Sequence, residues 1–175
     1  MAILRRDDAV LVVIDVQEAF RTAVDRFEET AQAVGRLVQG AHILGVPIVV
    51  SEQYPKGLGA TVPEVGLEDE RPLPKTVFAA TRAEGFDLGG RTQALVCGIE
   101  AHVCVHQTVQ DLLAHGVEVH VCADAVSSRT PENRAIGLER AREAGALVTS
   151  VETALLELCG EAGTPEFKAV QQVIM

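Results

Sequence analysis

Residue types that together can hydrolyse an acyl bond occur at Asp15, Lys75 and Cys104. A thiol needs a base to take its proton and an electrostatic environment that holds the thiolate. Asp15 is suited to be that base, and Lys75 is suited to lower the pKa of its neighbours and to orient the pair. The acyl carbonyl oxygen would also need two preorganised N–H donors, which the start of a helix supplies. The three residues therefore predict nucleophilic acyl chemistry, if the fold brings them together.

Cys104, in the segment GIEAHVC, is the cysteine whose position favours reactivity. We expect it in the first turn of a helix, where the positive end of the helix dipole favours the thiolate. Cys97, Cys122 and Cys159 fall within expected strands or a helix, and they fit the role of small buried apolar residues. No CxxC pair occurs, so we expect free thiols rather than disulfides or a zinc site.

Two histidines beside the cysteine, His102 and His106, offer an alternative Cys–His dyad. Residues two apart on a helix point in different directions, so neither ring is expected to face the thiol well. The same two histidines have the i,i+4 spacing of a metal-binding pair, which we interpret as coincidence.

The elements that must position these residues alternate between strands and helices. Apolar runs of strand length predict six strands, at 9–14, 46–50, 76–79, 94–99, 117–122 and 146–151. Helical spacing of apolar residues lies between them, and Thr or Ser caps predict helix starts at Thr130-Pro131, Ser150 and Thr164-Pro165. This order predicts a single α/β domain over residues 1–175, with a parallel sheet and right-handed crossovers.

In such a sheet ligands bind beyond the carboxyl ends of the strands, near the point where the strand order reverses. Asp15 directly follows the first expected strand, and Cys104 follows the fourth. Lys75 comes after a long loop, residues 52–74, rich in proline and glycine. Long loops inside a compact domain often have a functional reason to exist. The candidate residues thus lie where a ligand site is expected.

Composition narrows the possible partners. Hydrophobic residues make up 47% of the chain and aromatic residues 3%, which suits buried parallel strands built from small aliphatic side chains. A net charge of −10 repels phosphate backbones and anionic lipid, so we expect neither nucleic-acid nor membrane partners. No apolar stretch approaches the roughly 20 residues of a membrane-spanning helix, and MAILRRDDAV lacks the apolar core of a signal peptide. We therefore expect a cytoplasmic protein.

Three blocks, LVVIDVQEAF, PKTVFAA and ALVCGIEAHVCVHQTVQDL, resemble the isochorismatase-like cysteine hydrolases, which include nicotinamidases. The blocks fall in the family's order, and SEQYPKGLG and CGIEAHVC look most similar to its isochorismatase-domain-containing branch. The resemblance implies a three-layer α/β/α fold with a six-stranded parallel sheet in the order 3-2-1-4-5-6. It places Asp15, Lys75 and Cys104 in a catalytic triad. It also implies a cis peptide between Ile99 and Glu100, with the N–H groups of Glu100 and Cys104 forming the oxyanion hole.

The sequence departs from two branches of this family. Nicotinamidases hold a metal with an Asp-x-His motif after the second strand, whereas this chain has Ser51-Glu52-Gln53 there, so we expect no metal or other cofactor. True isochorismatases lack the catalytic cysteine, so Cys104 favours acyl-thioester chemistry over vinyl-ether hydrolysis. Pocket-lining residues are expected near the mouth of the site, at Gln17, Phe20, Gln53, Tyr54 and Phe78.

The sequence therefore predicts a cysteine hydrolase that acts on a small amide or related C–N acyl bond through a covalent thioester. The partner is expected to be a small-molecule substrate, and the resemblance implies a homo-oligomer, a dimer or larger. Two alternatives stay open. Cys104 could belong to a redox-active thiol protein, or the chain could be a non-catalytic interaction protein that retains the pocket.

Overall fold

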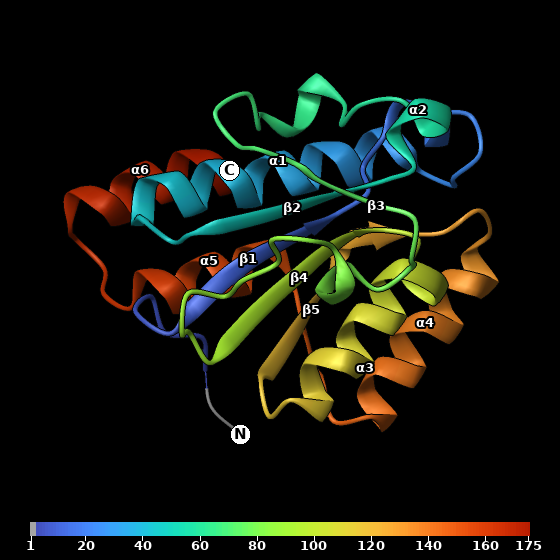
Figure 1. Cartoon of the computed structure of the whole chain (residues 1–175). Coiled ribbons are helices and arrows are strands. Elements are labelled where there is room, and N and C mark those ends of the chain that lie inside the picture. The colour runs from blue at the N-terminus through green and yellow to red at the C-terminus, as the bar shows by residue number, and fades with distance from the viewer. Residues whose placement is uncertain (1–2) are drawn as a thin grey trace.

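A computed structural model describes residues 3–175. Its sheet has six strands, all parallel, in the order β3-β2-β1-β4-β5-β6 (Figure 1). The predicted architecture and strand order are confirmed. The strands are β1 (Ala9–Ile14), β2 (Ile48–Gln53), β3 (Leu73–Lys75), β4 (Gln93–Ile99), β5 (Glu118–Ser127) and β6 (Leu147–Thr149).

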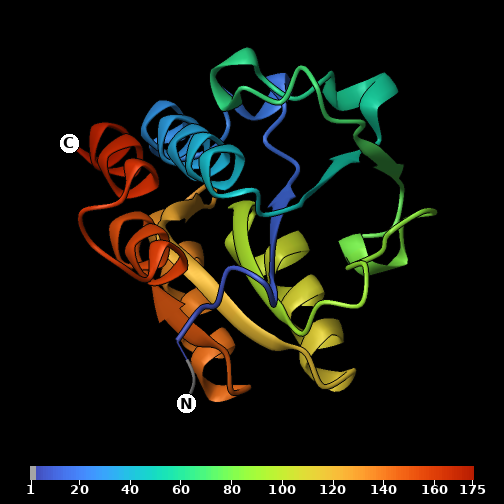
Figure 2. The same ribbon diagram turned by 90° about the vertical axis from the view of Figure 1, so that its left-hand side faces the viewer.

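Two layers of helices cover the sheet on opposite sides (Figure 2). One layer contains α1, α5 and α6, and the other contains α3 and α4; the short α2 lies in the loop before β3. The helices are α1 (Phe27–Leu44), α2 (Pro55–Leu58), α3 (His106–Ala114), α4 (Pro131–Glu143), α5 (Val151–Cys159) and α6 (Pro165–Ile174). Over residues 3–175, no helix combines the length and apolar character needed to cross a bilayer.

The sequence of β1 is apolar throughout because the strand is buried on both faces of the sheet. Successive side chains of a strand point to opposite faces, and both faces of this sheet are covered by helices. Leu11 and Val13 belong to the core beneath α1 and α5, whereas Val10 and Val12 belong to the core beneath α3 and α4. All six residues of the strand are buried. The strand that carries Asp15 is therefore held rigidly from both sides.

Helix starts follow the predicted capping residues. The side-chain oxygens of Thr130, Ser150 and Thr164 accept hydrogen bonds from backbone N–H groups three residues later, at 3.2, 3.2 and 3.0 Å. Such a cap contributes about 1 kcal/mol to the stability of a helix. The predicted helix starts at all three positions are confirmed.

The third strand was placed wrongly by the sequence pattern. The structure has no strand at 76–79; β3 is Leu73–Lys75, and Lys75 is its last residue. Val77 and Phe78 are 43% and 50% exposed, so their apolar character does not mark a buried strand. Edge strands are often short and tolerate proline, and β3 contains Pro74. Placing Lys75 at the carboxyl end of β3 sets it at the same edge as the ends of β1 and β4.

The strand order reverses between β1 and β4, which are neighbours in the sheet although 78 residues lie between them in sequence. Gly98 near the end of β4 allows the two backbones to approach closely there. Its φ is 113°, and a Cβ at this position would overlap the carbonyl oxygen of Ile14. The residues following β1 and β4 are therefore brought close together, at the edge where an α/β sheet binds ligands.

Candidate active site

All three predicted triad residues lie at the carboxyl ends of strands. Asp15 directly follows β1 with a φ of 52°, a region in which aspartate is tolerated better than most residues. Lys75 ends β3, and Cys104 lies in a π-helical turn, Ala101–Val105, between β4 and α3. The Asp15 and Lys75 side chains are fully buried, and Cys104 is 6% exposed. Single π-helical turns occur frequently at functional sites.

Asp15 and Lys75 form a buried ion pair. The distance from Lys75 Nζ to Asp15 Oδ2 is 2.7 Å, and the Ser51 hydroxyl donates to Asp15 Oδ1 at 2.7 Å. Charges removed from water are tolerated only when paired and hydrogen-bonded, and both carboxylate oxygens meet that condition here. The carboxylate is thus fixed in position.

The ammonium group of Lys75 has further acceptors around it. Gln53 Oε1 lies 2.6 Å from Nζ, and the backbone carbonyl oxygens of Phe78 and Val77 lie at 3.0 and 3.4 Å. An ammonium has three protons to donate, so these acceptors and Asp15 use its full capacity. These hydrogen bonds therefore fix the Lys75 ammonium group beside the Asp15 carboxylate.

Gln17 and Gln53 form a hydrogen-bond network that fixes the position of Lys75. Gln17 is fully buried; its Nε2 donates to the carbonyl oxygens of Gln53 and Gly59 at 3.0 and 2.7 Å, and its Oε1 accepts from the Gln53 N–H at 2.7 Å. Gln53 in turn donates to the carbonyl oxygen of Thr76 at 3.0 Å. Both glutamines were predicted as pocket-lining residues, and the structure places them as a brace that joins β2, the loop after it and Lys75.

The Cys104 thiol is influenced by both charged partners. Its pKa is raised to about 12: burial is the largest cause, the Asp15 carboxylate also raises it, and the Lys75 ammonium partly opposes the shift. The expectation of a lowered pKa at the helix start was therefore wrong in sign, because burial, the largest cause, disfavours the charged thiolate. With its pKa raised, Cys104 is a neutral thiol at neutral pH, and it would need a base in order to act as a nucleophile.

Glu100 lies between β4 and the π-helical turn, and the peptide bond from Ile99 to Glu100 is cis, as the resemblance implies. Its carboxylate accepts from Arg129 through Nη2 at 2.7 Å, Nε at 3.1 Å and the backbone N–H at 2.9 Å. Burial alone would raise the pKa of Glu100, but the hydrogen bonds from Arg129 outweigh it and lower the pKa. Sequence reasoning missed Arg129, although its place two residues after the end of β5, at the edge where ligands bind, could have indicated it.

Among the described residues, neither of the two histidines near Cys104 is hydrogen-bonded to the thiol. His102 Nδ1 lies 3.0 Å from Ser128 Oγ. The pKa of His106 is lowered by burial and by the charge of Arg140, and its Nδ1 has no hydrogen-bond partner among the described residues. A Cys–His dyad gains no support from this arrangement.

Two cavities open at this end of the sheet. One, of about 460 Å³, is lined by residues that include Tyr54, Lys75 and Val77, and the other, of about 210 Å³, by residues that include Phe20 and Glu100. Of the predicted pocket residues, Phe20 lines the smaller cavity and Tyr54 the larger one. The side chain of Phe78 is half exposed, and its carbonyl oxygen contacts Lys75.

The positions that hold a metal in nicotinamidases are engaged differently here. Ser51 donates to Asp15, Glu52 Oε1 accepts from the N–H and hydroxyl of Thr61 at 2.7 and 2.8 Å, and Gln53 is bound to Lys75. Within residues 3–175, no group of three or more His, Cys, Asp or Glu side chains is placed to hold a metal ion. The residues present do not fit a metal site.

We therefore expect the purified protein to contain no stoichiometric zinc, iron or manganese, because neutral or amide side chains replace the ligands that these ions prefer. Elemental analysis of protein purified without chelators measures this. One tightly bound transition metal per chain would contradict the expectation and would require a different ligand set.

Comparison with known proteins places this arrangement in a family. A family model for the isochorismatase domain matches residues 9–153. The human isochorismatase domain-containing protein 2 is 43% identical over 169 residues, which are 95% of this chain and 82% of that protein. The mouse isochorismatase domain-containing protein 2A is 40% identical over 171 residues, 96% of this chain and 83% of that protein.

A solved structure agrees over almost the whole chain. A Caenorhabditis elegans protein described as the MAR1 ribonuclease superposes with a TM-score of 0.91 at 40% identity, covering 99% of this chain and 92% of that one. Fold, strand order and sequence all match the same group of proteins, and the chain belongs to the isochorismatase family.

Proposed function

We propose that this protein is a cysteine hydrolase that cleaves a small amide or related C–N acyl bond through a covalent thioester on Cys104. Membership of the isochorismatase family supports a hydrolase. The observation that carries the proposal is the buried Asp15–Lys75 pair, at 2.7 Å, whose charges both act on the Cys104 thiol. A buried carboxylate, a lysine and a thiol that influence one another at the ligand-binding edge of an α/β sheet are the parts that nucleophilic acyl transfer needs.

In the first half of the reaction, Cys104 Sγ attacks the acyl carbon while its proton passes to Asp15. The carbonyl oxygen becomes an oxyanion, which the backbone N–H groups of Glu100 and Cys104 stabilise. Collapse of this intermediate breaks the C–N bond, and the leaving amine takes the proton from Asp15. The product of this half is a thioester of Cys104.

In the second half, water attacks the thioester carbon and gives a proton to Asp15. Collapse of the second tetrahedral intermediate breaks the C–S bond, the acid leaves, and the proton on Asp15 returns to the sulfur. Lys75 takes no proton in either half. Its positive charge, fixed by Gln53 and the backbone, stabilises the negative charge that moves between Asp15 and Cys104.

The experiment that tests this function is a screen of small amides and esters with the wild-type protein and Cys104→Ala. We expect at least one small amide to be hydrolysed by the wild type, with the alanine variant at least about 10³-fold slower because the nucleophile is absent. Equal turnover by both proteins would remove Cys104 from the mechanism.

A second candidate activity comes from the C. elegans protein, which is described as a ribonuclease at 40% identity. The net charge of −10 opposes binding to an RNA backbone. Incubation of labelled single-stranded RNA with wild type and Cys104→Ala distinguishes the two activities. Cleavage by the wild type that is lost in the variant would favour RNA as the substrate, and intact RNA beside hydrolysed amide supports the amide proposal.

A redox role for Cys104 has less support than acyl chemistry. Oxidation by peroxide proceeds through the thiolate, and burial raises the pKa of Cys104 to about 12. The neutral, nearly buried thiol is a poor target for peroxide at neutral pH. In acyl transfer the same thiol loses its proton to Asp15 only when the substrate is bound.

We also propose that the chain forms a homo-oligomer. Tyr54, Val77 and Phe78 lie close in sequence to β2 and β3 and are 54%, 43% and 50% exposed. Tyr54 and Val77 also line the same cavity, and contiguous exposed apolar side chains are typical of contact surfaces. Light scattering coupled to size-exclusion chromatography measures the mass directly, and a mass of 18.6 kDa would show a monomer.

A further inference from the structure

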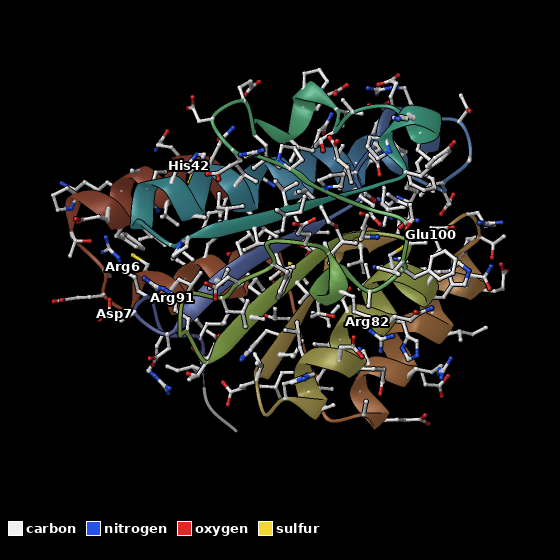
Figure 3. The ribbon with its side chains drawn as sticks, in the orientation of Figure 1. Arg6, Asp7, His42, Arg82, Arg91 and Glu100 are labelled. Atoms are coloured by element: carbon white, nitrogen blue, oxygen red, sulfur yellow. The ribbon has the colours of Figure 1, made fainter. Side chains whose placement is uncertain are left out.

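A small cavity beside Glu100 has a composition that suits the non-reacting end of a substrate. Its volume is about 210 Å³, and it is lined by Phe20, Ala23, Val24, Glu100 and Arg129. Pockets for drug-sized ligands range from roughly 300 to 1,000 Å³, so this one accommodates a group of only a few atoms. Figure 3 places Glu100 at one end of the sheet, with Arg6 and Arg91 at the other.

The cavity lies beside the proposed reaction centre. Glu100 lines it, and the backbone N–H of the same residue is one of the two proposed oxyanion donors. Phe20 and Val24 come from the segment that follows Asp15 at the end of β1. An acyl group seated with its carbonyl oxygen at Glu100 can therefore extend its remaining atoms into this space.

The ion pair between Glu100 and Arg129, which lines the cavity, leaves a hydrogen-bond donor free. Arg129 uses its Nε and Nη2 for the Glu100 carboxylate, and within residues 3–175 its Nη1 has no acceptor. The Glu100 side chain is 6% exposed and that of Arg129 62%, so the guanidinium remains open to a ligand. One edge of the cavity thus offers N–H donors, while Phe20 and Val24 offer an apolar wall.

The charges around this space cancel in pairs. Glu100 balances Arg129, Asp15 balances Lys75, and Cys104 is a neutral thiol. A carboxylate in the cavity would approach Arg129 but also Glu100, and the net charge of −10 gives it no long-range attraction. An uncharged acceptor, such as a carboxamide or hydroxyl oxygen, can take the free donor without that repulsion.

We infer, on the basis of the proposed amidase function, that this cavity selects small uncharged amides bearing a second hydrogen-bond acceptor, and that Glu100 excludes carboxylates from it. Arg129 contacts the acceptor, so it is a specificity-determining residue. The side chain of Glu100 acts through its charge, separately from the proposed role of its backbone N–H.

The test compares two ligands of almost equal shape, succinamide and succinamate, which differ in one terminal carboxamide or carboxylate. Binding is measured by calorimetry on Cys104→Ala, so that turnover is not required. We expect succinamide to bind more tightly than succinamate. In Cys104→Ala with Glu100→Gln, which keeps the shape and removes the charge, the Kd ratio should shift toward succinamate by about tenfold or more.

Two further variants complete the design. Adding Arg129→Gln to the Glu100→Gln protein removes both charges and should restore the preference for succinamide. Arg5→Met breaks an exposed Arg–Asp ion pair of similar kind near the start of β1, and it should leave the Kd ratio unchanged. Circular dichroism and melting curves verify that each variant is folded.

The outcomes separate this inference from the proposed function. An unchanged Kd ratio in Glu100→Gln, tighter succinamate binding by the starting protein, or no binding of either ligand would overturn the inference. Selective binding as expected, together with no amide hydrolysis by wild type, would uphold the selectivity of the cavity and overturn the amidase proposal instead.

Discussion

Lys75→Met is expected to lower both stability and activity, because it leaves the carboxylate of Asp15 buried without its partner. Both side chains of the pair are fully buried, and Nζ is 2.7 Å from Oδ2. Removing one partner of such a pair costs about 3–5 kcal/mol of unfolding free energy. Turnover should fall by about 10²–10³, since the positive charge beside the reacting groups is lost.

Urea unfolding and kcat/KM on a substrate from the screen measure the two effects of Lys75→Met. The double variant Asp15→Asn with Lys75→Met removes both charges, and it should recover most of the stability but none of the activity. Lys56→Met replaces an exposed lysine on the rim of the larger cavity and should alter stability little. A Lys75→Met protein with wild-type stability and turnover would contradict the structural account of the pair.

Asp15→Asn is expected to make the thiol more reactive while it abolishes turnover. In the wild type, burial and the Asp15 carboxylate raise the pKa of Cys104, and Lys75 opposes them. Without the carboxylate, Lys75 faces the thiol alone and the pKa falls, so the thiolate fraction at neutral pH rises about tenfold for each unit of the fall. Amide hydrolysis should nevertheless decrease by about 10²–10⁴, because asparagine cannot accept the thiol proton.

The pH dependence of alkylation by iodoacetamide, with peptide mapping of Cys104, measures this change. The midpoint for Asp15→Asn should lie well below that of the wild type, in which burial and the Asp15 carboxylate raise the pKa of Cys104 to about 12. Asp124→Asn is the matched control, since Asp124 accepts from the thiol of a different buried cysteine, Cys122, at 3.3 Å. Slower or unchanged alkylation of Cys104 in Asp15→Asn, with turnover retained, would mean that Asp15 is not the base.

The strands that are buried on both faces were the ones whose positions could be predicted from the sequence. β1 and β4 are covered on both faces, so their sequences are continuous apolar runs, and the predicted ranges 9–14 and 94–99 agree closely with the structure. β3 has three residues at the sheet edge, too few to show a pattern. The apolar residues at 76–79 instead follow β3, where Val77 and Phe78 are about half exposed.

The part of the site that could be predicted is the part set by the direction of the parallel strands. Parallel strands end at one edge, and this alone brought Asp15 and Cys104 to the same place. The hydrogen bonds between Gln17 and Gln53 join two segments that are distant in sequence. Residue spacing along the chain does not predict such contacts. The sign of the pKa shift of Cys104 depends on burial in three dimensions, and the position of a residue on a helix does not report it.

Detection of an acyl-enzyme tests the central claim most directly. The protein is mixed with an activated ester of a small acyl group, quenched in acid within seconds, and examined by intact-mass and peptide-mapping mass spectrometry. We expect one acyl group per chain, located on Cys104 and absent from Cys104→Ala, because the thioester is an obligatory intermediate. Substrate hydrolysis with no adduct on Cys104, and with turnover retained in Cys104→Ala, would contradict a thioester mechanism.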